Sequence, residues 1–366
     1  MTPLPRTLAL LEQGRAAGIH LGAQLYASLR GTPVAEIAFG ESRAGVPMAA
    51  DTINIWFSSG KPLTAVVIAQ CFERGLIALD DPIAKFIPEF AMHGKRAITI
   101  RHLLTHTAGF RDADKISADL GWDETITRIC ATPAEADWPP GRRAGYQYFS
   151  SWFVLGEIVR RLDGRAVGEY IREEILVPLG MHDSWMGIPP DQFRDYGERL
   201  GWMHIVTATG LKSRTLWNSG AVAASCRPGS NARGPMGELA RLYEALLAFR
   251  VRTDGAPLLS AGTVRLFTSR QRVGLFDETF QHTLDWGLGF LVDSNRYGAD
   301  AVPYGYGRHS SEETFGHGGS QSSSAFADPK HGLVAAWLCN GMPGERLHQL
   351  RARDLNTALY EDLGLA

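Results

Sequence analysis

Cysteine is scarce in this sequence. The 366 residues contain four cysteines, and no two of them form a C-x-x-C pair. A disulfide framework, a zinc site and a redox motif each need numerous or closely spaced cysteines, so the sequence favours none of them. We expect buried free thiols, which pack as small apolar side chains. The four cysteines are Cys71, Cys130, Cys226 and Cys339.

Net charge is also small, and long apolar runs are missing. The formal charge is −2 at pH 7, without the basic excess by which proteins bind nucleic acid or anionic membranes. No stretch approaches the roughly 20 apolar residues of a membrane span. The apolar run from Leu8 to Leu11 is too short for a signal peptide, and Glu12 follows it. We therefore expect a cytoplasmic protein with no nucleic-acid or membrane partner, whose oligomeric state the sequence leaves open.

Three common catalytic signatures are missing as well. No G-x-S-x-G occurs, which argues against the nucleophile elbow of α/β-hydrolases. His102 and His106 are four residues apart, but no Glu follows His102 as a zinc protease requires, so we expect both histidines to pack at a helix end. The Gly-rich stretch 305–319 lacks the Gly-Lys-Ser or Gly-Lys-Thr of a phosphate loop. The sequence thus predicts neither a metal nor a cofactor.

The residues that are present fit a folded protein of one large domain or two interleaved lobes. Apolar residues make up 45% of the chain and charged residues 21%, which is ordinary for a globular protein. Strand patterns lie near both ends, at 22–29, 34–39, 286–293, 323–328 and 333–340. Helical patterns cover 62–74, 151–161, 168–176, 237–250 and 347–363.

Strands at both ends with helices between them predict a sheet lobe built from both termini, into which a helical lobe is inserted. The predicted class is α/β plus all-α, with an antiparallel sheet flanked by helices. We assign residues 1–80 and 280–366 to the α/β lobe and residues 81–279 to a mainly helical lobe. The active site is expected between the two lobes.

The segment W-F-S-S-G-K-P at residues 56–62 places Ser58 three residues before Lys61 at a predicted helix start. Residues three apart share one helix face, so the two side chains can come within hydrogen-bond distance. The following helix is apolar on nearly all sides and is therefore buried. Burial lowers the pKa of a lysine from about 10.4 toward about 7–8, where the amine can act as a base. We interpret Ser58 as the nucleophile and Lys61 as its base; the alternative is a helix N-cap serine followed by a solvated lysine.

Further segments make the sequence resemble the serine β-lactamase and penicillin-binding-protein type of hydrolases, which include family VIII carboxylesterases and D-aminopeptidase-like proteins. Pro-Leu-Thr-Ala follows the S-x-x-K pair, and G-L-I-A-L-D-D-P at 75–82 resembles the family's turn after the nucleophile helix. I-R-H-L-L-T-H-T-A-G at 100–109 resembles its I-R-x-L-L-T-H-T-A-G segment. The resemblance runs from about residue 15 to the C-terminus. It implies a β-lactamase/transpeptidase-like fold and catalysis through an acyl-enzyme.

The resemblance also implies a catalytic tyrosine six residues after the proline of a Pro-Gly pair. Here the proline is Pro140 and the tyrosine is Tyr146, whose hydroxyl would donate a proton to the leaving group. Tyr148 is the competing candidate, and a packed core tyrosine is the other alternative. Penicillin-recognising members carry Tyr-x-Asn, whereas this chain has Tyr148 in place of the Asn. The loss of this donor to a substrate amide favours esters over β-lactams and peptides.

The segment F-G-H-G-G-S at 315–320 resembles the family's K-T-G motif in its H-x-G form. The resemblance places His317 opposite the nucleophile, and the backbone N–H groups of Ser58 and Ser320 in an oxyanion hole. Gly318 and Gly319 would let a substrate approach the backbone closely. A histidine titrating near pH 6.5 in place of a permanent lysine charge predicts weak recognition of a substrate carboxylate at neutral pH. A turn histidine in a Gly-rich loop is the alternative.

Together with the resemblance, these residues predict a serine hydrolase acting on small-molecule carboxylic esters of small or medium acyl groups. Amide chemistry, as in a β-lactamase or a D-amino-acid amidase or peptidase, is one alternative. Acyl transfer to a bulky acceptor is another, and a non-catalytic penicillin-binding-like sensor is a third. We expect the loop 300–314 to shape the pocket and one or two large aromatic residues to wall an acyl pocket. The aromatic candidates are Trp122, Trp138, Trp152, Trp286, Tyr304 and Tyr306.

Overall fold

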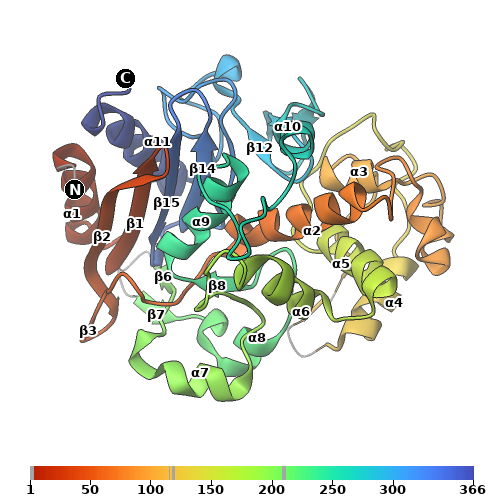
Figure 1. The fold of residues 1–366 in the computed structure, drawn as a ribbon, viewed down its shortest axis with the longest axis horizontal. Helices are drawn as coiled ribbons and strands as arrows, with labels where there is room; N and C mark the ends of the chain where they lie inside the picture. Colours follow the sequence, from red (N-terminus) through yellow and green to blue (C-terminus); the bar gives the residue numbers. More distant parts are fainter. Residues whose placement is uncertain (1–3, 115, 118–119, 208–211) are drawn as a thin grey trace.

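Both ends of the chain contribute strands to one antiparallel sheet, as predicted (Figure 1). The computed structural model describes residues 4–366 except 115, 118–119 and 208–211. The eight strands follow the order β11-β12-β13-β14-β15-β1-β2-β3, and each neighbouring pair is antiparallel. Their bounds are β1 Gly22–Leu29, β2 Thr32–Arg43, β3 Val46–Pro47, β11 Asp285–Trp286, β12 Leu291–Val292, β13 Phe315–Gly319, β14 Ser323–Asp328 and β15 Leu333–Cys339.

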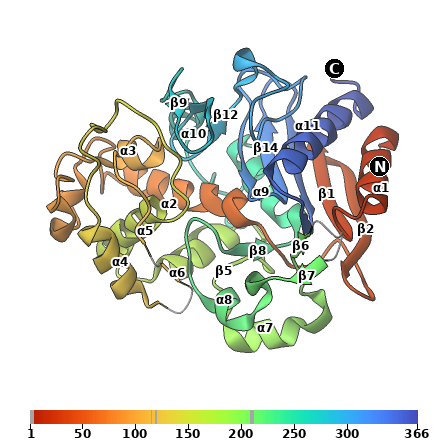
Figure 2. The ribbon, with the colours of Figure 1, turned by 180° about the vertical axis from the view of Figure 1, so that it is seen from behind.

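Helices cover both faces of this sheet, which explains why its central strands β14 and β15 are buried along their whole length. In β15, Trp337 and the residues two positions away along the strand pack with α1 (Pro5–Ala16) and α11 (Glu345–Asp362). The intervening residues, such as Ala336, face α9 (Met236–Leu246) on the opposite side. Figure 2 shows α1 beside α11, although they lie at opposite ends of the chain. The antiparallel sheet flanked by helices is thus confirmed.

The helix α2 (Lys61–Glu73) runs from the sheet into the helical part of the molecule (Figure 1). Its residues are buried from Lys61 to Cys71, as its apolar sequence predicts. It packs against α5 and β13, so it connects the helical part to the sheet. The other helices are α3 Ile100–Leu104, α4 Trp122–Ala131, α5 Ser150–Asp163, α6 Val167–Ile171, α7 Pro190–Tyr196, α8 Gly220–Ala224 and α10 Ala261–Thr268.

Several predicted elements differ from the structure. The single strand predicted over 286–293 is wrong, because Gly289 has a φ of +84° and the chain reverses between β11 and β12. The helix predicted over 168–176 continues from α6 as a π-helical turn at Arg172–Leu176. The helix predicted over 237–250 ends at Leu246, and the N-terminal helix α1 was not predicted.

Short strands also occur in the region predicted to be mostly helices and loops. Strand β8 pairs with β4 and β5, and β6 pairs with β7 and β16. These strands hold the segment before Ser58 in place, because β4 ends three residues before it. Their bounds are β4 Asn54–Ile55, β5 Trp185–Met186, β6 His204–Val206, β7 Lys212–Arg214, β8 Ala232–Gly234, β9 Phe276–Asp277, β10 His282–Thr283 and β16 Gly341–Met342.

The division into an α/β lobe (1–80 and 280–366) and a helical lobe (81–279) stays a prediction. Helix α9 falls in the second range but packs against β1, β14 and β15. All four cysteines are free; three are buried and Cys226 is partly exposed. Over the part of the chain that the structure describes, each helix is too short or too polar to span a bilayer.

Candidate active site

Ser58 and Lys61 meet where the chain enters α2. Ser58 lies in a 3₁₀ turn, Phe57–Gly60, and Lys61 is the first residue of the helix. Lys61 Nζ lies 3.0 Å from Ser58 Oγ. Lys61 is completely buried, whereas Ser58 is 8% exposed and lines a cavity. The structure therefore brings the predicted pair together at a surface that a substrate can reach.

The surroundings of Lys61 suit a base. Burial lowers the pKa of this amine to about 7, and the negative charge of Asp112 partly opposes that shift. Lys61 Nζ donates to the carbonyl oxygens of Tyr148, at 3.0 Å, and Gly229, at 2.5 Å. A neutral amine has two N–H groups and one lone pair. The two carbonyls occupy both N–H groups, which leaves the lone pair directed at the Ser58 hydroxyl.

The residue before Ser58 holds an unusual backbone conformation. Phe57 has a φ of +50°, a region that costs a non-glycine residue about 1–2 kcal/mol. Its ring packs edge-to-face against Trp217 at 5.3 Å between centroids. This packing of a buried ring offsets the cost, and the sharp turn brings Ser58 to the cavity wall. Nothing in the sequence pattern predicted the role of Phe57.

A network of hydroxyl groups fastens the nucleophile turn to the sheet. Ser59 Oγ donates to the His317 carbonyl oxygen at 3.1 Å and lies 3.0 Å from Ser323 Oγ. Ser323 Oγ donates to the Trp56 carbonyl oxygen at 3.0 Å. Strands β13 and β14 are thereby held against the turn. Gly319 is required for this contact, because a Cβ at this position would clash with the Trp56 carbonyl oxygen.

Gly318 is also required by packing. A Cβ on Gly318 would overlap the ring of Tyr304, whose backbone has a φ of +55°. Gly318 also lines the cavity at Ser58, and the expected close approach of a substrate to this backbone stays a prediction. Protein atoms already occupy the space that a side chain at either position would take.

His317 lies in the predicted position, but its predicted titration is wrong. Burial and the nearby charge of Lys61 lower its pKa to about 3, while the hydrogen bond to Gly318 opposes the shift. His317 Nδ1 lies 2.7 Å from the Gly318 carbonyl oxygen. Since a carbonyl only accepts, Nδ1 carries the hydrogen and Nε2 has a free lone pair. Within the described part of the chain, this buried Nε2 has no hydrogen-bond partner, so the ring is neutral throughout the physiological range.

Of the two candidate tyrosines, Tyr146 has its hydroxyl at the nucleophile. Its side chain lines the same cavity as Ser58, and its ring centroid lies 5.1 Å from Lys61 Nζ. Burial raises the pKa of Tyr146 well above 10, and the interaction with the Ser58 side chain only partly opposes this. Tyr146 is therefore a protonated donor at neutral pH. Tyr148 is 48% exposed and meets Lys61 through its backbone carbonyl instead.

Asp112 positions the segment between the tyrosines and α5, and no sequence motif pointed to it. Its carboxylate accepts from the backbone N–H groups of Tyr148, Phe149 and Ser150, at 2.7, 3.0 and 2.6 Å. These groups lie at the N-terminus of α5, where a negative charge is favourable. Asp112 is also the charge that raises the pKa of Lys61. It therefore acts on both the shape and the electrostatics of the site.

His102 and His106 lie at the start and just beyond the end of α3, as expected, and each also accepts a backbone hydrogen bond. His102 Nδ1 accepts from the Thr99 backbone N–H in a capping box at the start of α3. His106, with a φ of +56°, accepts from the Gln147 backbone N–H at 3.1 Å. Its ring centroid lies 4.6 Å from that of Tyr146. His106 therefore supports the tyrosine segment.

A buried ion pair holds the other side of Tyr146. Asp277 and Arg272 are both buried and lie 3.1 Å apart. Asp277 Oδ1 also accepts from the backbone N–H groups of Tyr146, at 3.0 Å, and Phe280, at 3.1 Å. Removing either charge would leave its partner buried and unpaired, which typically costs about 3–5 kcal/mol. No motif marked Asp277 in the sequence.

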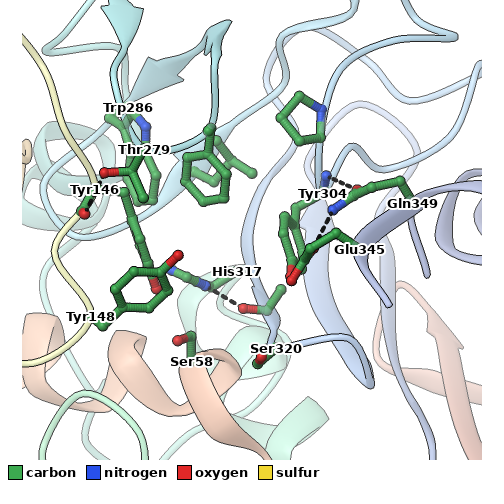
Figure 3. A pocket seen from close by; sticks show the side chains of 14 residues that line it. Ser58, Tyr146, Tyr148, Thr279, Trp286, Tyr304, His317, Ser320, Glu345 and Gln349 are labelled. Atoms are coloured by element: carbon green, nitrogen blue, oxygen red, sulfur yellow. Dashed lines mark hydrogen bonds between the residues drawn. The ribbon is translucent and has the colours of Figure 1, made fainter. Parts of the chain in front are cut away.

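Ser58 lies between two hollows. The larger has a volume of about 210 Å³, and Figure 3 shows Ser58 beneath it, with Tyr146 and Tyr148 on one side and Tyr304 and Glu345 on the other. The smaller is about 90 Å³. The larger is lined by Ser58, Tyr146, Tyr148, Thr279, Phe280, Trp286, Leu291, Pro303, Tyr304, His317, Gly318, Ser320, Glu345 and Gln349. The smaller is lined by Phe57, Ser58, Tyr148, Phe149, Trp217, Ser230, Ser320 and Met342.

Both hollows share Ser58 and Ser320, the residues expected to supply oxyanion-hole N–H groups. Trp286 and Tyr304 line the larger one, in agreement with the expectation that one or two of the named aromatic residues are at the site. Tyr304 comes from the loop 300–314, which was expected to shape the pocket. In the described residues, no three His, Cys, Asp or Glu side chains gather as metal ligands would.

Known proteins match this chain in sequence and in fold. The family model described as beta-lactamase matches residues 8–359. Penicillin-binding protein 4 of Amycolatopsis lactamdurans is 30% identical over 317 residues, covering 84% of this chain and 77% of the relative. Esterase/beta-lactamase LipL of Mycobacterium tuberculosis is 26% identical over 360 residues, covering 92% and 80%. The solved structure of a family VIII carboxylesterase has a TM-score of 0.77 and 25% identity, covering 98% of this chain and 97% of its own.

Proposed function

Because this chain belongs to the beta-lactamase family, we propose that it is a serine hydrolase that cleaves small-molecule carboxylic esters through an acyl-enzyme on Ser58. One observation carries the proposal: the amine of Lys61 lies 3.0 Å from Ser58 Oγ with its two other hydrogen bonds taken by carbonyl oxygens. With a pKa of about 7, this amine is a base at neutral pH.

In the acylation step, Ser58 Oγ forms a bond to the ester carbonyl carbon and its proton passes to Lys61 Nζ. The carbonyl oxygen becomes an oxyanion, which the backbone N–H groups of Ser58 and Ser320 stabilise. The bond from the carbonyl carbon to the alcohol oxygen then breaks. That oxygen takes the proton of the Tyr146 hydroxyl, and the proton on Lys61 returns to Tyr146. A neutral alcohol leaves, and the acyl group stays on Ser58.

Deacylation reverses these roles with water as the nucleophile. A water molecule bonds to the acyl carbon and gives a proton to Lys61, which is again a neutral amine. The bond from that carbon to Ser58 Oγ breaks, and Oγ recovers the proton. The products are a carboxylic acid and free enzyme, so no cofactor enters the balance.

Three observations favour esters over β-lactams and amides. Tyr148 stands where penicillin-recognising members have an Asn. Gln147 does not replace that Asn, because its side chain bonds the Phe110 carbonyl oxygen and Ser151 inside the helical part. His317 is neutral, so the position that holds a lysine charge in the K-T-G form lacks one. The solved structure named a family VIII carboxylesterase supports the same substrate class.

The test is pre-steady-state hydrolysis of p-nitrophenyl butyrate. We expect a burst of p-nitrophenolate equal to the enzyme concentration, lost in Ser58→Ala and in Lys61→Met. Turnover of nitrocefin faster than of any ester would instead assign a β-lactamase. Stable labelling by a fluorescent penicillin without turnover would assign a sensor. Ester cleavage only in the presence of an added alcohol or amine would assign an acyltransferase.

A further inference from the structure

Aromatic rings form a continuous arc around the larger hollow. The ring centroids of Tyr148 and Tyr146 lie 5.2 Å apart, those of Tyr146 and Phe280 4.8 Å, and those of Phe280 and Tyr304 5.7 Å. The arc starts above Ser58 and ends on the opposite wall (Figure 3). Trp286 stands behind Tyr146, at 5.8 Å. The negative faces of such rings attract cations.

The Glu345 carboxylate closes the far end of this arc. Tyr304 donates its hydroxyl to the two carboxylate oxygens, at 3.0 and 3.3 Å, and Gln349 Nε2 donates at 3.2 Å. The charge of Glu345 contributes to the raised pKa of Tyr304 and also of Tyr148 on the opposite wall, after burial as the main cause in both.

No cationic side chain balances that carboxylate in the lining. Among the described residues that line the larger hollow, none is Lys or Arg, and His317 is neutral. Lys61 lies behind Ser58, and its pKa of about 7 leaves it largely uncharged above neutral pH. Glu345 is thus the one formal charge that the described lining presents to a substrate. An anionic group would be repelled here, and a cationic group attracted.

The position of Tyr146 decides which half of an ester lies in each hollow. Tyr146 lines the larger hollow and does not line the smaller. Under the proposed function its hydroxyl protonates the leaving oxygen, so the alcohol half must lie on its side. The acyl half then occupies the smaller hollow, beside Phe149 and Trp217.

We propose that the larger hollow binds a cationic leaving group, an ammonium-bearing alcohol, between the arc of rings and Glu345. The inference rests on the proposed function, because it uses the direction in which the ester is cleaved. The hollow of about 210 Å³ has room for about seven groups of water size, at ~30 Å³ each, which accommodates a small quaternary amino alcohol.

A pair of substrates that differ only in charge tests the proposal. Acetylthiocholine carries a trimethylammonium group, and S-(3,3-dimethylbutyl) thioacetate replaces its nitrogen with carbon. We expect kcat/KM at fixed ionic strength to be about tenfold higher for the cationic ester. Glu345→Gln should reduce this ratio about fivefold, and Phe280→Leu should reduce it about threefold by removing one ring. Glu312→Gln removes the same charge from a different surface hollow and should leave the ratio unchanged.

The outcomes separate the inference from the proposed function. The cationic leaving group would be overturned if the neutral thioester were cleaved as fast as the cationic one or faster, and if Glu345→Gln did not change the ratio of their rates. The proposed esterase function would then still stand. Failure to cleave either thioester together with no burst from p-nitrophenyl butyrate would overturn both. Glu345 begins α11, so thermal melting of each variant checks that a changed ratio does not come from unfolding.

Discussion

The ring of Tyr304 lies on the Cα of Gly318, in the space where any other residue would carry its Cβ. This contact joins the loop 300–314 to the strand that lies opposite the nucleophile. Gly318→Ala should push the ring into the larger hollow, lower kcat/KM for p-nitrophenyl butyrate about tenfold, and cost about 1–3 kcal/mol of unfolding free energy. Gly121→Ala is the matched control, because its Cβ meets no atom within 4 Å. Full activity and unchanged stability in Gly318→Ala would contradict the contact.

The pH profile should report the Lys61 amine. Lys61 acts as a base only when it is deprotonated, so kcat/KM for p-nitrophenyl butyrate should rise with pH and level off above about 7. Below that value the rate should fall about tenfold for each pH unit, as for a single titrating base. Stopped-flow assays between pH 5 and 9 would measure the profile. A rate that stays flat from pH 5 to 8 would show that Lys61 is not the base.

His317 should make the folded state less stable in acid. Its pKa is lowered to about 3 from an unfolded value near 6.5, so the unfolded chain binds one more proton between those values. Stability attributable to this ring is present above pH 6.5 and decreases by up to about 1.4 kcal/mol per pH unit as the pH falls toward 3. Urea unfolding of wild type and His317→Gln between pH 4.5 and 7.5 measures the difference in slope. Parallel curves would mean that folding does not lower the pKa of this ring.

The smaller hollow should limit the length of the acyl group. Its volume of about 90 Å³ has room for about three groups of water size, which fits acetyl to butyryl esters. Trp217→Ala should lengthen the smaller hollow. The p-nitrophenyl ester that is cleaved fastest should then be the hexanoate, whereas for the wild type it should be the butyrate or a shorter ester. The substitution also removes the ring that packs on Phe57, so a loss of about 1–2 kcal/mol in stability should accompany the change. Leu216→Ala, at a neighbouring residue that is 73% exposed, should keep the wild-type preference.

The features that could be predicted from the sequence are those made by residues close together along the chain. Ser58 and Lys61 are three residues apart, so helix geometry alone places them together. The resemblance located Tyr146 and His317 by fixed offsets from nearby Pro and Gly residues. The antiparallel sheet followed from strand patterns at both ends. These features depend on local spacing or on a motif.

The features that were missed act through backbone groups far away in the sequence. Asp112 binds the N–H of Tyr148, 36 residues on, and Asp277 binds that of Tyr146, 131 residues back. A side chain that accepts from a distant backbone N–H leaves no pattern of its own, because any residue can donate. The pKa of His317 was mispredicted for a related reason: its burial depends on strands and loops that meet only in the fold.

A substitution at Asp112 tests whether its charge tunes the pKa of Lys61 or its carboxylate only holds the start of α5 in place. Asp112→Asn keeps an oxygen to accept from the N-terminus of α5 but removes the negative charge that raises the pKa of Lys61. The pKa of Lys61 should therefore fall further, and the acidic limb of the kcat/KM profile should move to lower pH by about half a unit. Asp114→Asn removes an exposed charge two residues away and should leave the limb in place. If Asp112→Asn lowers the rate equally at every pH, its carboxylate serves only to hold the helix, and the charge does not tune the base.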